Sequence, residues 1–351
     1  MQAVHRILCK NIFVILAVVF AFLAGKLLSV NAAVIPDVDQ EILNNWAEQC
    51  ITFDDNAIRS FINQSAADIA NADRSEKAAQ AAFSSSFSNR LEIQKLISFA
   101  REGEGPLPYT LPENYMDLLT FYKNLNTPRV INEIPYDLYF QLQSTNIVPV
   151  LVLVIGSVFW GVHYEAEIYK YTNTVKYGRK YIIAFRLILW TFSMALLIAN
   201  EAIDLMVSDL AETGYLWTAP LQSYSHFQHS QINCAFGTIY ALMCCSKVSS
   251  ITLMCFIAEY LAKKMKTLKD TILFGFSALI LLMFLEKGLQ RTPYHGIQQL
   301  GCVDWLNIIG NTVILLPMRV PSVVLGVIVT AGVMCSWGLI SSYKKHCWQA
   351  S

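Results

Sequence analysis

The chain has few charged residues for its length. Of its 351 residues, 15% are charged and 54% are hydrophobic, and the mean hydropathy is +0.41. A water-soluble domain of this size needs more polar surface, so the composition excludes an ordinary soluble protein. Lysine and arginine are also absent from one whole segment, 204–233, although the net charge of the chain is zero. Both shortages are typical of a membrane protein.

Motifs for nucleotide binding, metal binding and hydrolysis are missing as well. Ala24-Gly25-Lys26 ends like a phosphate loop, but no glycine stands five positions before Gly25 and Leu27 replaces the required hydroxyl residue. His226 and His229 have no cysteine or carboxylate placed as a third metal ligand. No Gly-x-Ser-x-Gly or His-Glu-x-x-His pattern occurs. We therefore expect no catalytic residue, no metal and no cofactor bound by this chain, and no nucleic-acid partner.

Long apolar runs are the dominant feature that is present. A helix needs about 20 apolar residues to cross a hydrocarbon core. Five runs approach or exceed this length: 12–30, 146–162, 181–199, 235–262 and 320–340. A sixth run, 271–285, is shorter and nearly uncharged, and a weaker run, 305–316, suits a re-entrant or interfacial piece. The sequence predicts an all-α polytopic membrane protein with six transmembrane helices.

The basic residues indicate how these helices are oriented. Positively charged residues stay on the cytoplasmic side of short loops. Twelve of them fall at every second boundary between the runs: Arg6, Lys10, Lys170, Lys176, Arg179, Lys180, Lys263, Lys264, Lys266, Lys269, Lys344 and Lys345. The pattern predicts a multi-pass protein of the cell (plasma) membrane with both termini in the cytoplasm.

Three regions follow from this topology. Residues 1–33 contain the cytoplasmic N-terminus and the first helix, which Lys26 interrupts and which also fits a cleaved secretory signal. Residues 146–351 form a five-helix membrane domain. The region between them, 34–145, is the large extracytoplasmic segment. Three cysteines are expected outside: Cys50, Cys234 and Cys302. Any two of them could form a disulfide in an oxidising compartment.

The extracytoplasmic segment is acidic and mainly helical. It carries 16 Asp and Glu residues against 8 Lys and Arg residues between Asp37 and Asp137. Leu43, Ala47 and Cys50 recur at helical spacing, and a second helix is predicted over 91–100 after the run of serines at 84–86. The acidic surface is either a solvated face or a docking face for a cationic substrate or partner.

Two charges lie within the predicted spans. Lys247 stands near the middle of the run 235–262, where a charge is costly and often functional. It either faces a translocation path or snorkels to the outer interface, because this run is longer than a bilayer requires. Arg186 lies a few residues into the third span and is expected to snorkel to the inner interface.

The stretch Tyr164–Lys180 is a compact polar segment between two apolar runs. Its acidic residues come first and its basic residues last, which is the favourable order for a helix dipole. Its larger apolar residues recur at i+4, i+3 and i+4, so the spacing predicts a short amphipathic helix at the inner interface. A plain positively charged cytoplasmic loop is the alternative. Gly178 permits a tight turn into the third span.

This segment resembles the coupling region of the permease subunits of ATP-binding-cassette type 2 exporters. In that family an acidic residue after the second span is followed by a Thr/Ser-rich stretch that ends in Gly-Arg. The matching positions here are Glu165, Glu167, Thr174, Lys176, Gly178 and Arg179. Ala219–Ser223 is similar to a Pro-Ile-Gln-Ser-like segment of bacterial members. The glycine that often follows the acidic residue is missing, and the acidic-to-Arg spacing is slightly short.

The resemblance implies a transport function. The chain would be the permease subunit of an exporter, a homodimer or a heterodimer with a second permease, without an ATPase site of its own. A separate cytoplasmic ATPase would bind and hydrolyse ATP and dock on the coupling helix 164–180, which would drive alternating access. The alternative is a membrane anchor or receptor whose acidic extracytoplasmic domain binds a ligand or partner.

Overall fold

A computed structural model describes residues 12–33, 37–68, 74–102, 120, 122–144, 148–168, 170, 178–224, 233–277 and 280. Within these ranges the chain forms helices and no β-sheet. The elements are α2 (Ile12–Ala32), α3 (Gln40–Gln49), η1 (Cys50–Thr52), α4 (Asp55–Asp68), α5 (Arg74–Glu102), α7 (Ile134–Ser144), α8 (Val148–Glu165), α10 (Gly178–Val207), α11 (Gly214–Thr218), η3 (Leu221–Ser223) and α12 (Phe236–Met265). Residues 268–277 form a further helix. The predicted all-α class is confirmed for these residues.

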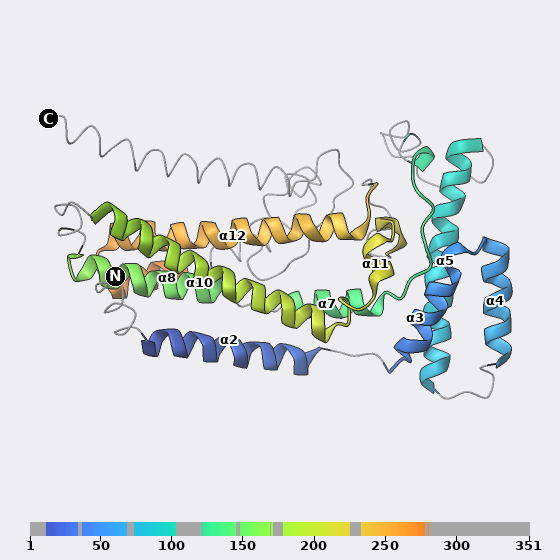
Figure 1. The fold of residues 1–351 in the computed structure, drawn as a ribbon, viewed down its shortest axis with the longest axis horizontal. Helices are drawn as coiled ribbons and strands as arrows, with labels where there is room; N and C mark the ends of the chain where they lie inside the picture. Colours follow the sequence, from blue (N-terminus) through green and yellow to red (C-terminus); the bar gives the residue numbers. More distant parts are fainter. Residues whose placement is uncertain are drawn as a thin grey trace.

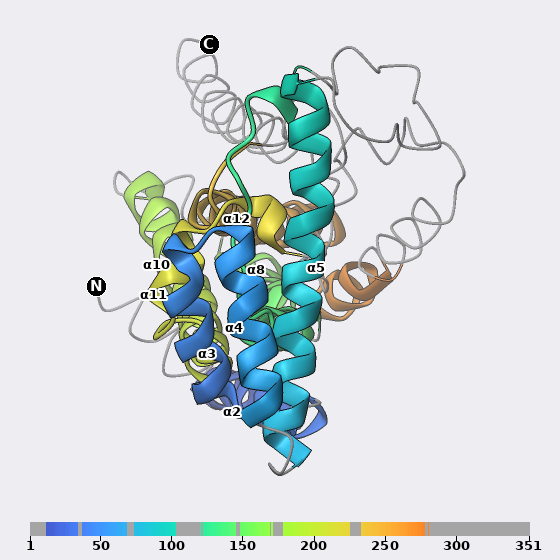
Figure 2. The same cartoon turned by 90° about the vertical axis from the view of Figure 1, so that its right-hand side faces the viewer.

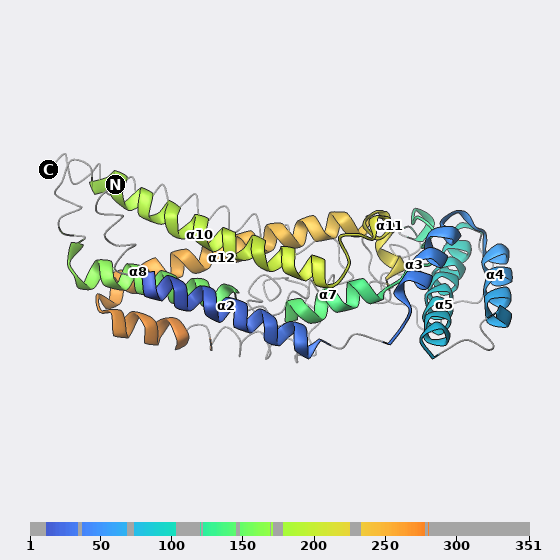
Figure 3. The same ribbon diagram turned by 60° about the horizontal axis from the view of Figure 1, so that its bottom comes forward.

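The helices form two parts of different shape. The long helices α2, α8, α10 and α12 run along the long axis of the molecule as a bundle, whereas α3, α4 and α5 lie at one end and cross that axis (Figure 1). Seen end-on, the three helices of this head run side by side (Figure 2). Successive long helices alternate in direction, so the end of α8, the start of α10 and the turn 265–268 lie at the bundle end far from the head (Figure 3).

The bundle is apolar both inside and outside. Its buried core includes Phe22, Trp160, Leu189 and Met254, one from each long helix. Its outer face exposes Phe13, Leu16, Phe20, Leu23, Leu187, Trp190 and Ile198. Helices that are apolar all round belong in an apolar solvent or in the core of a larger assembly. Close packing between α8 and α12 depends on Gly156, where an added Cβ would lie 2.7 Å from the Cβ of Ala258.

Two of the described helices are long and apolar enough to cross a membrane. These are Phe13–Ala32 and Ile182–Val207, and Val150–Glu165 is a shorter apolar helix. They coincide with the first, third and second predicted runs, and α12 covers the fourth. The runs 305–316 and 320–340 lie outside the described residues, and 271–285 is described only in part. The number of six spans therefore stays a prediction.

The head has a separate core. Leu43 of α3 and Cys50 of η1 belong to this core, and Ala47 of α3 is buried at the joint with the bundle, so all three are buried as their spacing predicts. Asp39 caps this helix by accepting the Ile42 N–H at 3.0 Å. The aromatic rings of Trp46, Phe53, Phe61 and Phe83 pack edge to face around the three helices.

The serine run in α5 does not interrupt the helix. The sequence predicts two helices separated near 84–86, but α5 continues without a break from Arg74 to Glu102. The physical reason is that the serines find partners: Ser88 Oγ donates to Ser84 O at 2.9 Å, and buried Ser86 Oγ accepts the Ile131 N–H at 2.9 Å. Tertiary contacts thus override a weak local preference.

The segment Ala219–Ser223 joins the head to the bundle. Ser223 Oγ accepts the Arg129 N–H at 2.8 Å, and its carbonyl accepts Asn89 Nδ2 of α5 at 3.3 Å. Ala47 of α3 packs into the same apolar cluster as Leu216 and Leu221. This segment is therefore buried at a joint. Cys50 and Cys234 are free thiols, and Cys302 lies outside the described residues.

Candidate functional site

Charged residues from three apolar helices meet inside the bundle near the head. Lys26 comes from α2, Glu201 and Asp204 from the last turns of α10, and Lys247 from α12. Lys26 interrupts the apolar run of α2, and the packing of the helices brings it to Asp204, 178 residues away. The four side chains are buried or nearly so, with 0 to 12% of each exposed. They form the outer charge network of this site.

The first ion pair joins Lys26 to Asp204. Lys26 Nζ lies 2.5 Å from Asp204 Oδ1, and both side chains are buried. The second oxygen, Asp204 Oδ2, accepts Gln143 Nε2 at 2.7 Å and Asn200 Nδ2 at 3.0 Å. Asn200 and Asp204 are four residues apart on α10 and therefore share one face of the helix.

The second ion pair joins Lys247 to Glu201. Lys247 Nζ lies 2.7 Å from Glu201 Oε1 and 2.9 Å from the Tyr139 hydroxyl oxygen. The Tyr139 hydroxyl in turn donates to Glu201 Oε2 at 2.9 Å. Gln143 Nε2 also donates to Glu201 Oε1 at 2.9 Å, so this amide of α7 bridges the two carboxylates.

The outer charge network is balanced. Two ammonium groups face two carboxylates, and each of the four carboxylate oxygens accepts at least one donor. A buried ion pair contributes little to the net free energy of unfolding. Removal of one partner leaves the other charge buried without compensation and destabilises the fold by about 3–5 kcal/mol. The network joins side chains of α2, α7, α10 and α12, so a different arrangement of these helices would have to break it.

A second pair lies toward the other end of the same two helices. Arg186 of α10 and Glu259 of α12 form a two-fold contact, with Nε 2.8 Å from Oε2 and Nη2 2.5 Å from Oε1. Arg186 and Glu201 stand 15 residues apart, which is roughly 22 Å along a helix. We call Arg186–Glu259 the inner ion pair.

The inner ion pair reverses the polarity of the outer one. α10 contributes the cation at Arg186 and the anion at Glu201, whereas α12 contributes the anion at Glu259 and the cation at Lys247. Trp190 Nε1 donates to Thr252 Oγ1 at 3.0 Å between them. Sliding or inverting one helix would separate both pairs, so the charges specify the register of the antiparallel α10–α12 pair.

The structure gives both basic residues acidic partners. Arg186 pairs with Glu259, and its side chain stays 31% exposed, so its snorkelling to the inner interface stays a prediction. Lys247 does not snorkel, because Glu201 and Tyr139 hold its ammonium group inside the bundle. Its contact with a translocated substrate stays a prediction. The sequence analysis did not predict that Glu201, Asp204 and Glu259 pair with these basic residues. Their position in mostly apolar helices could have indicated it.

The predicted coupling segment is described at both ends. α8 ends at Glu165, and a turn at 166–167 follows, in which Glu167 has a positive φ of 53°. The predicted helix 164–180 is therefore interrupted at its start, because Glu167 adopts the left-handed conformation. Glu167 pairs with Lys170, and both side chains are more than half exposed. Thr174 and Lys176 lie outside the described residues, whereas Gly178 and Arg179 begin α10.

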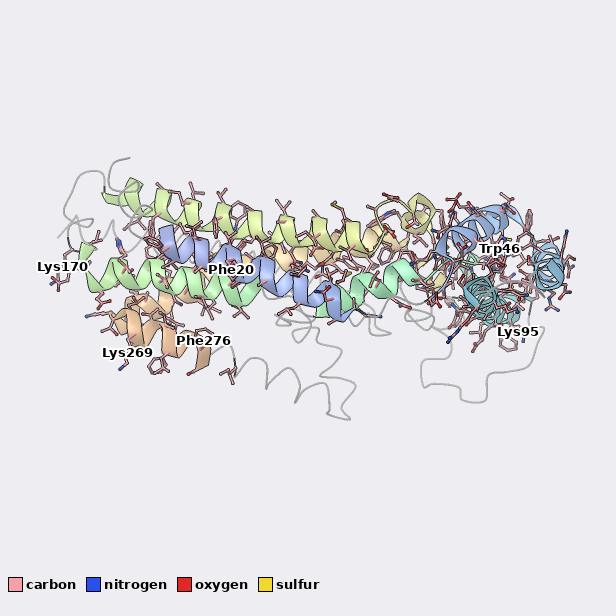
Figure 4. All side chains as sticks on the ribbon, turned by 90° about the horizontal axis from the view of Figure 1, so that it is seen from below. Phe20, Trp46, Lys95, Lys170, Lys269 and Phe276 are labelled. Atoms are coloured by element: carbon pink, nitrogen blue, oxygen red, sulfur yellow. The ribbon has the colours of Figure 1, made fainter. Side chains whose placement is uncertain are left out.

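Glu165 ties this segment to the end of α12. Its Oε2 accepts the backbone N–H of Leu268 at 3.2 Å, at the start of the helix that follows α12. Gly161 allows the close approach, because an added Cβ would lie 2.8 Å from Leu268 Cδ1. Lys170 and Lys269 accordingly lie at the same end of the bundle, opposite Trp46 and Lys95 of the head (Figure 4). The described residues of the predicted coupling segment and the outer charge network thus lie at different ends of the bundle.

No group of three or more metal-binding side chains occurs among the described residues. His226 and His229 lie outside them. Comparison of the chain with protein-family models, curated proteins and solved structures finds no match.

Proposed function

We propose that the chain is the membrane-spanning permease subunit of an ATP-binding-cassette exporter. In this proposal six spans cross the plasma membrane, both termini are cytoplasmic, and the head is extracytoplasmic. A separate cytoplasmic ATPase docks on the segment 164–180, and a second permease, identical or different, completes the pathway. The chain itself contributes no ATPase site.

The observation that carries the proposal is the contact between Glu165 and Leu268. It links the α8–α10 connection to the start of the helix after α12. Because α8 also packs closely on α12 through Gly156, a force on this connection would act on both helices together. A partner that changes shape during ATP hydrolysis can deliver such a force only through differential contacts in its two states.

The outer charge network and the inner ion pair support the same proposal. They join α10 to α12 at two levels that lie about 22 Å apart along the helix axis. Alternating access requires that one end of a bundle opens while the other stays closed. The outer charge network and the inner ion pair could each open or close one end of the bundle, which suits this requirement. A static anchor needs neither contact. Ionisable side chains inside membrane bundles commonly mark transport pathways.

The proposal is tested by charge reversal at the coupling segment. The neighbouring reading frames are searched for a phosphate-loop ATPase, and the chain is co-expressed with it, purified and reconstituted in liposomes. We expect Glu167→Lys and Arg179→Glu each to reduce ATPase co-purification and the stimulation of ATP hydrolysis at least tenfold. Lys95→Glu, an exposed reversal on the head, should leave both unchanged.

Folded variants that keep full ATPase binding and stimulation would refute the coupling role. If no neighbouring reading frame encodes such an ATPase and none co-purifies, the anchor or receptor alternative replaces the exporter. The head, with its own core of Leu43, Ile58 and Phe83, would then be the first place to look for ligand binding.

A further inference from the structure

Four lysines cluster at the turn between α12 and the helix 268–277. Lys263 and Lys264 lie in the last turn of α12, Lys266 ends it with a φ of 62°, and Lys269 opens the next helix. All four are exposed. The carbonyl end of a helix favours cations, which accounts for the first two positions but not for the other two.

Nearby carboxylates do not neutralise this cluster. Asp270 Oδ2 accepts the Thr267 hydroxyl at 2.6 Å, and Glu165 accepts the Leu268 N–H. Glu167 is paired with Lys170. Among the described residues none of the four lysines has an acidic side chain within ion-pair distance. The four ammonium groups belong to a stretch of seven residues, so an anion bound at the turn would reduce the repulsion between them.

Apolar surface begins directly beside the lysines. The helix 268–277 exposes Leu273, Phe274 and Phe276. On α12, Lys264 Nζ lies 5.9 Å from the centre of the exposed Tyr260 ring. Figure 4 places Lys269 and Phe276 on this short helix at the bundle end far from the head. The ammonium groups therefore lie at the border between a polar end and an apolar flank.

We propose that the turn Lys263–Lys269 binds the phosphate groups of anionic lipids in the inner leaflet. The proposal rests on the membrane topology given above. Lysines just cytoplasmic of a membrane helix are attracted to anionic headgroups, while the apolar flank contacts the acyl chains. An acidic protein surface could also pair with the lysines, but a lipid contacts the lysines through its phosphate and Leu273, Phe274 and Phe276 through its acyl chains.

The test compares lipid retention by charge variants of the full chain. The protein is reconstituted in nanodiscs of phosphatidylcholine and phosphatidylglycerol at 4:1, re-extracted in mild detergent, and its bound lipids are measured by mass spectrometry. We expect the native chain to enrich phosphatidylglycerol. In the variant with Lys263, Lys264, Lys266 and Lys269 changed to Gln, the ratio of bound phosphatidylglycerol to bound phosphatidylcholine should fall at least fivefold. The reason is that each lysine raises the affinity for an anionic lipid surface about fivefold. The fourfold Lys→Arg variant should keep it.

A matched control removes four charges from the head: Arg59→Gln, Lys77→Gln, Lys95→Gln and Lys123→Gln, all at exposed positions. Its lipid retention should equal that of the native chain. If the turn variant does not fold, a salt series on the native chain decides the question, because raising NaCl from 50 to 500 mM should abolish the enrichment.

Unchanged enrichment in the turn variant, or an enrichment independent of salt, overturns the proposal. Loss of ATPase binding with lipid retention intact also overturns it, in favour of an acidic protein surface. The measurement needs no ATPase, so it can succeed when the exporter proposal fails. Failure of the chain to enter nanodiscs would instead contradict the membrane topology itself.

Discussion

The head and the bundle are built with opposite arrangements of polar and apolar side chains. In the head, Leu43, Phe83 and Ile93 are buried and lysines such as Lys95 are exposed. In the bundle, Phe13, Phe20 and Leu28 are exposed, whereas Lys26, Asp204, Lys247 and Glu259 are buried. Both parts are helical, so secondary structure does not cause the difference.

The proposed membrane topology accounts for the difference, because it gives each part a different solvent. In water, burial of apolar surface stabilises a fold by about 25 cal/mol per Å². In hydrocarbon this term vanishes between helices, and packing of small residues together with polar pairs takes its place. Gly156 against Ala258, and the four ion-paired positions of the outer charge network, are the corresponding contacts in the bundle.

The largest expected effect comes from stranding a charge inside the bundle. Lys247→Met leaves the Glu201 carboxylate with only neutral donors and should destabilise the protein by about 3–5 kcal/mol. The double variant Lys247→Met/Glu201→Gln should recover most of this loss. The measurement is SDS-induced unfolding in mixed micelles.

The exposed pair Glu167–Lys170 provides the control. Lys170→Met should cost less than about 1 kcal/mol, because solvent screens a surface pair. If Lys247→Met is equally mild, the outer charge network is hydrated, and the proposed contrast between bundle and head is wrong.

A smaller effect is expected from a charge on the outer face of the bundle. Phe20→Arg, near the middle of α2, should cost about 3 kcal/mol if this face contacts hydrocarbon. The opposite exchange on the head, Lys95→Leu, should change stability by less than about 0.5 kcal/mol. Insertion efficiency into microsomal membranes and unfolding in micelles measure the two changes. A neutral Phe20→Arg would place this face in water or against protein.

The smallest effect concerns how the head keeps a buried ionisable group neutral. Burial raises the pKa of the Cys50 thiol from 9.0 to about 11, although the nearby Arg90 lowers it in part. The folded head therefore keeps the proton between about pH 9 and pH 11, whereas the unfolded chain releases it. The stability that Cys50 contributes is complete below pH 9 and is lost as the pH rises to about 11.

This pH dependence is measured as the difference in unfolding free energy between the native chain and Cys50→Ala from pH 8 to pH 11. The difference should shrink as the pH rises. Iodoacetamide should modify Cys50 at pH 8 about a hundredfold more slowly in the folded than in the unfolded protein, since the thiolate is scarcer by that factor. Equal rates in both states would show that this thiol is exposed.

Local patterns in the sequence predicted most of the helices. The spacing of Leu43, Ala47 and Cys50 predicted the buried face of α3, because periodicity depends only on neighbouring residues. The predicted break in the helix near 84–86 was wrong. Ser86 Oγ accepts the backbone N–H of Ile131, a residue 45 positions away that the local pattern does not include. The predicted coupling helix is interrupted at Glu167, whose backbone is left-handed with a φ of 53°, and Glu165 contacts Leu268, 103 residues away.

The sequence by itself determined that the described part of the chain is helical and that its long helices are strongly apolar. These properties depend on hydropathy and spacing within one segment. Only the tertiary structure decided that Lys26 pairs with Asp204, Lys247 with Glu201 and Arg186 with Glu259. The physical reason is that a charge in an apolar helix has to find a partner, and helix packing, which is non-local, brings that partner near.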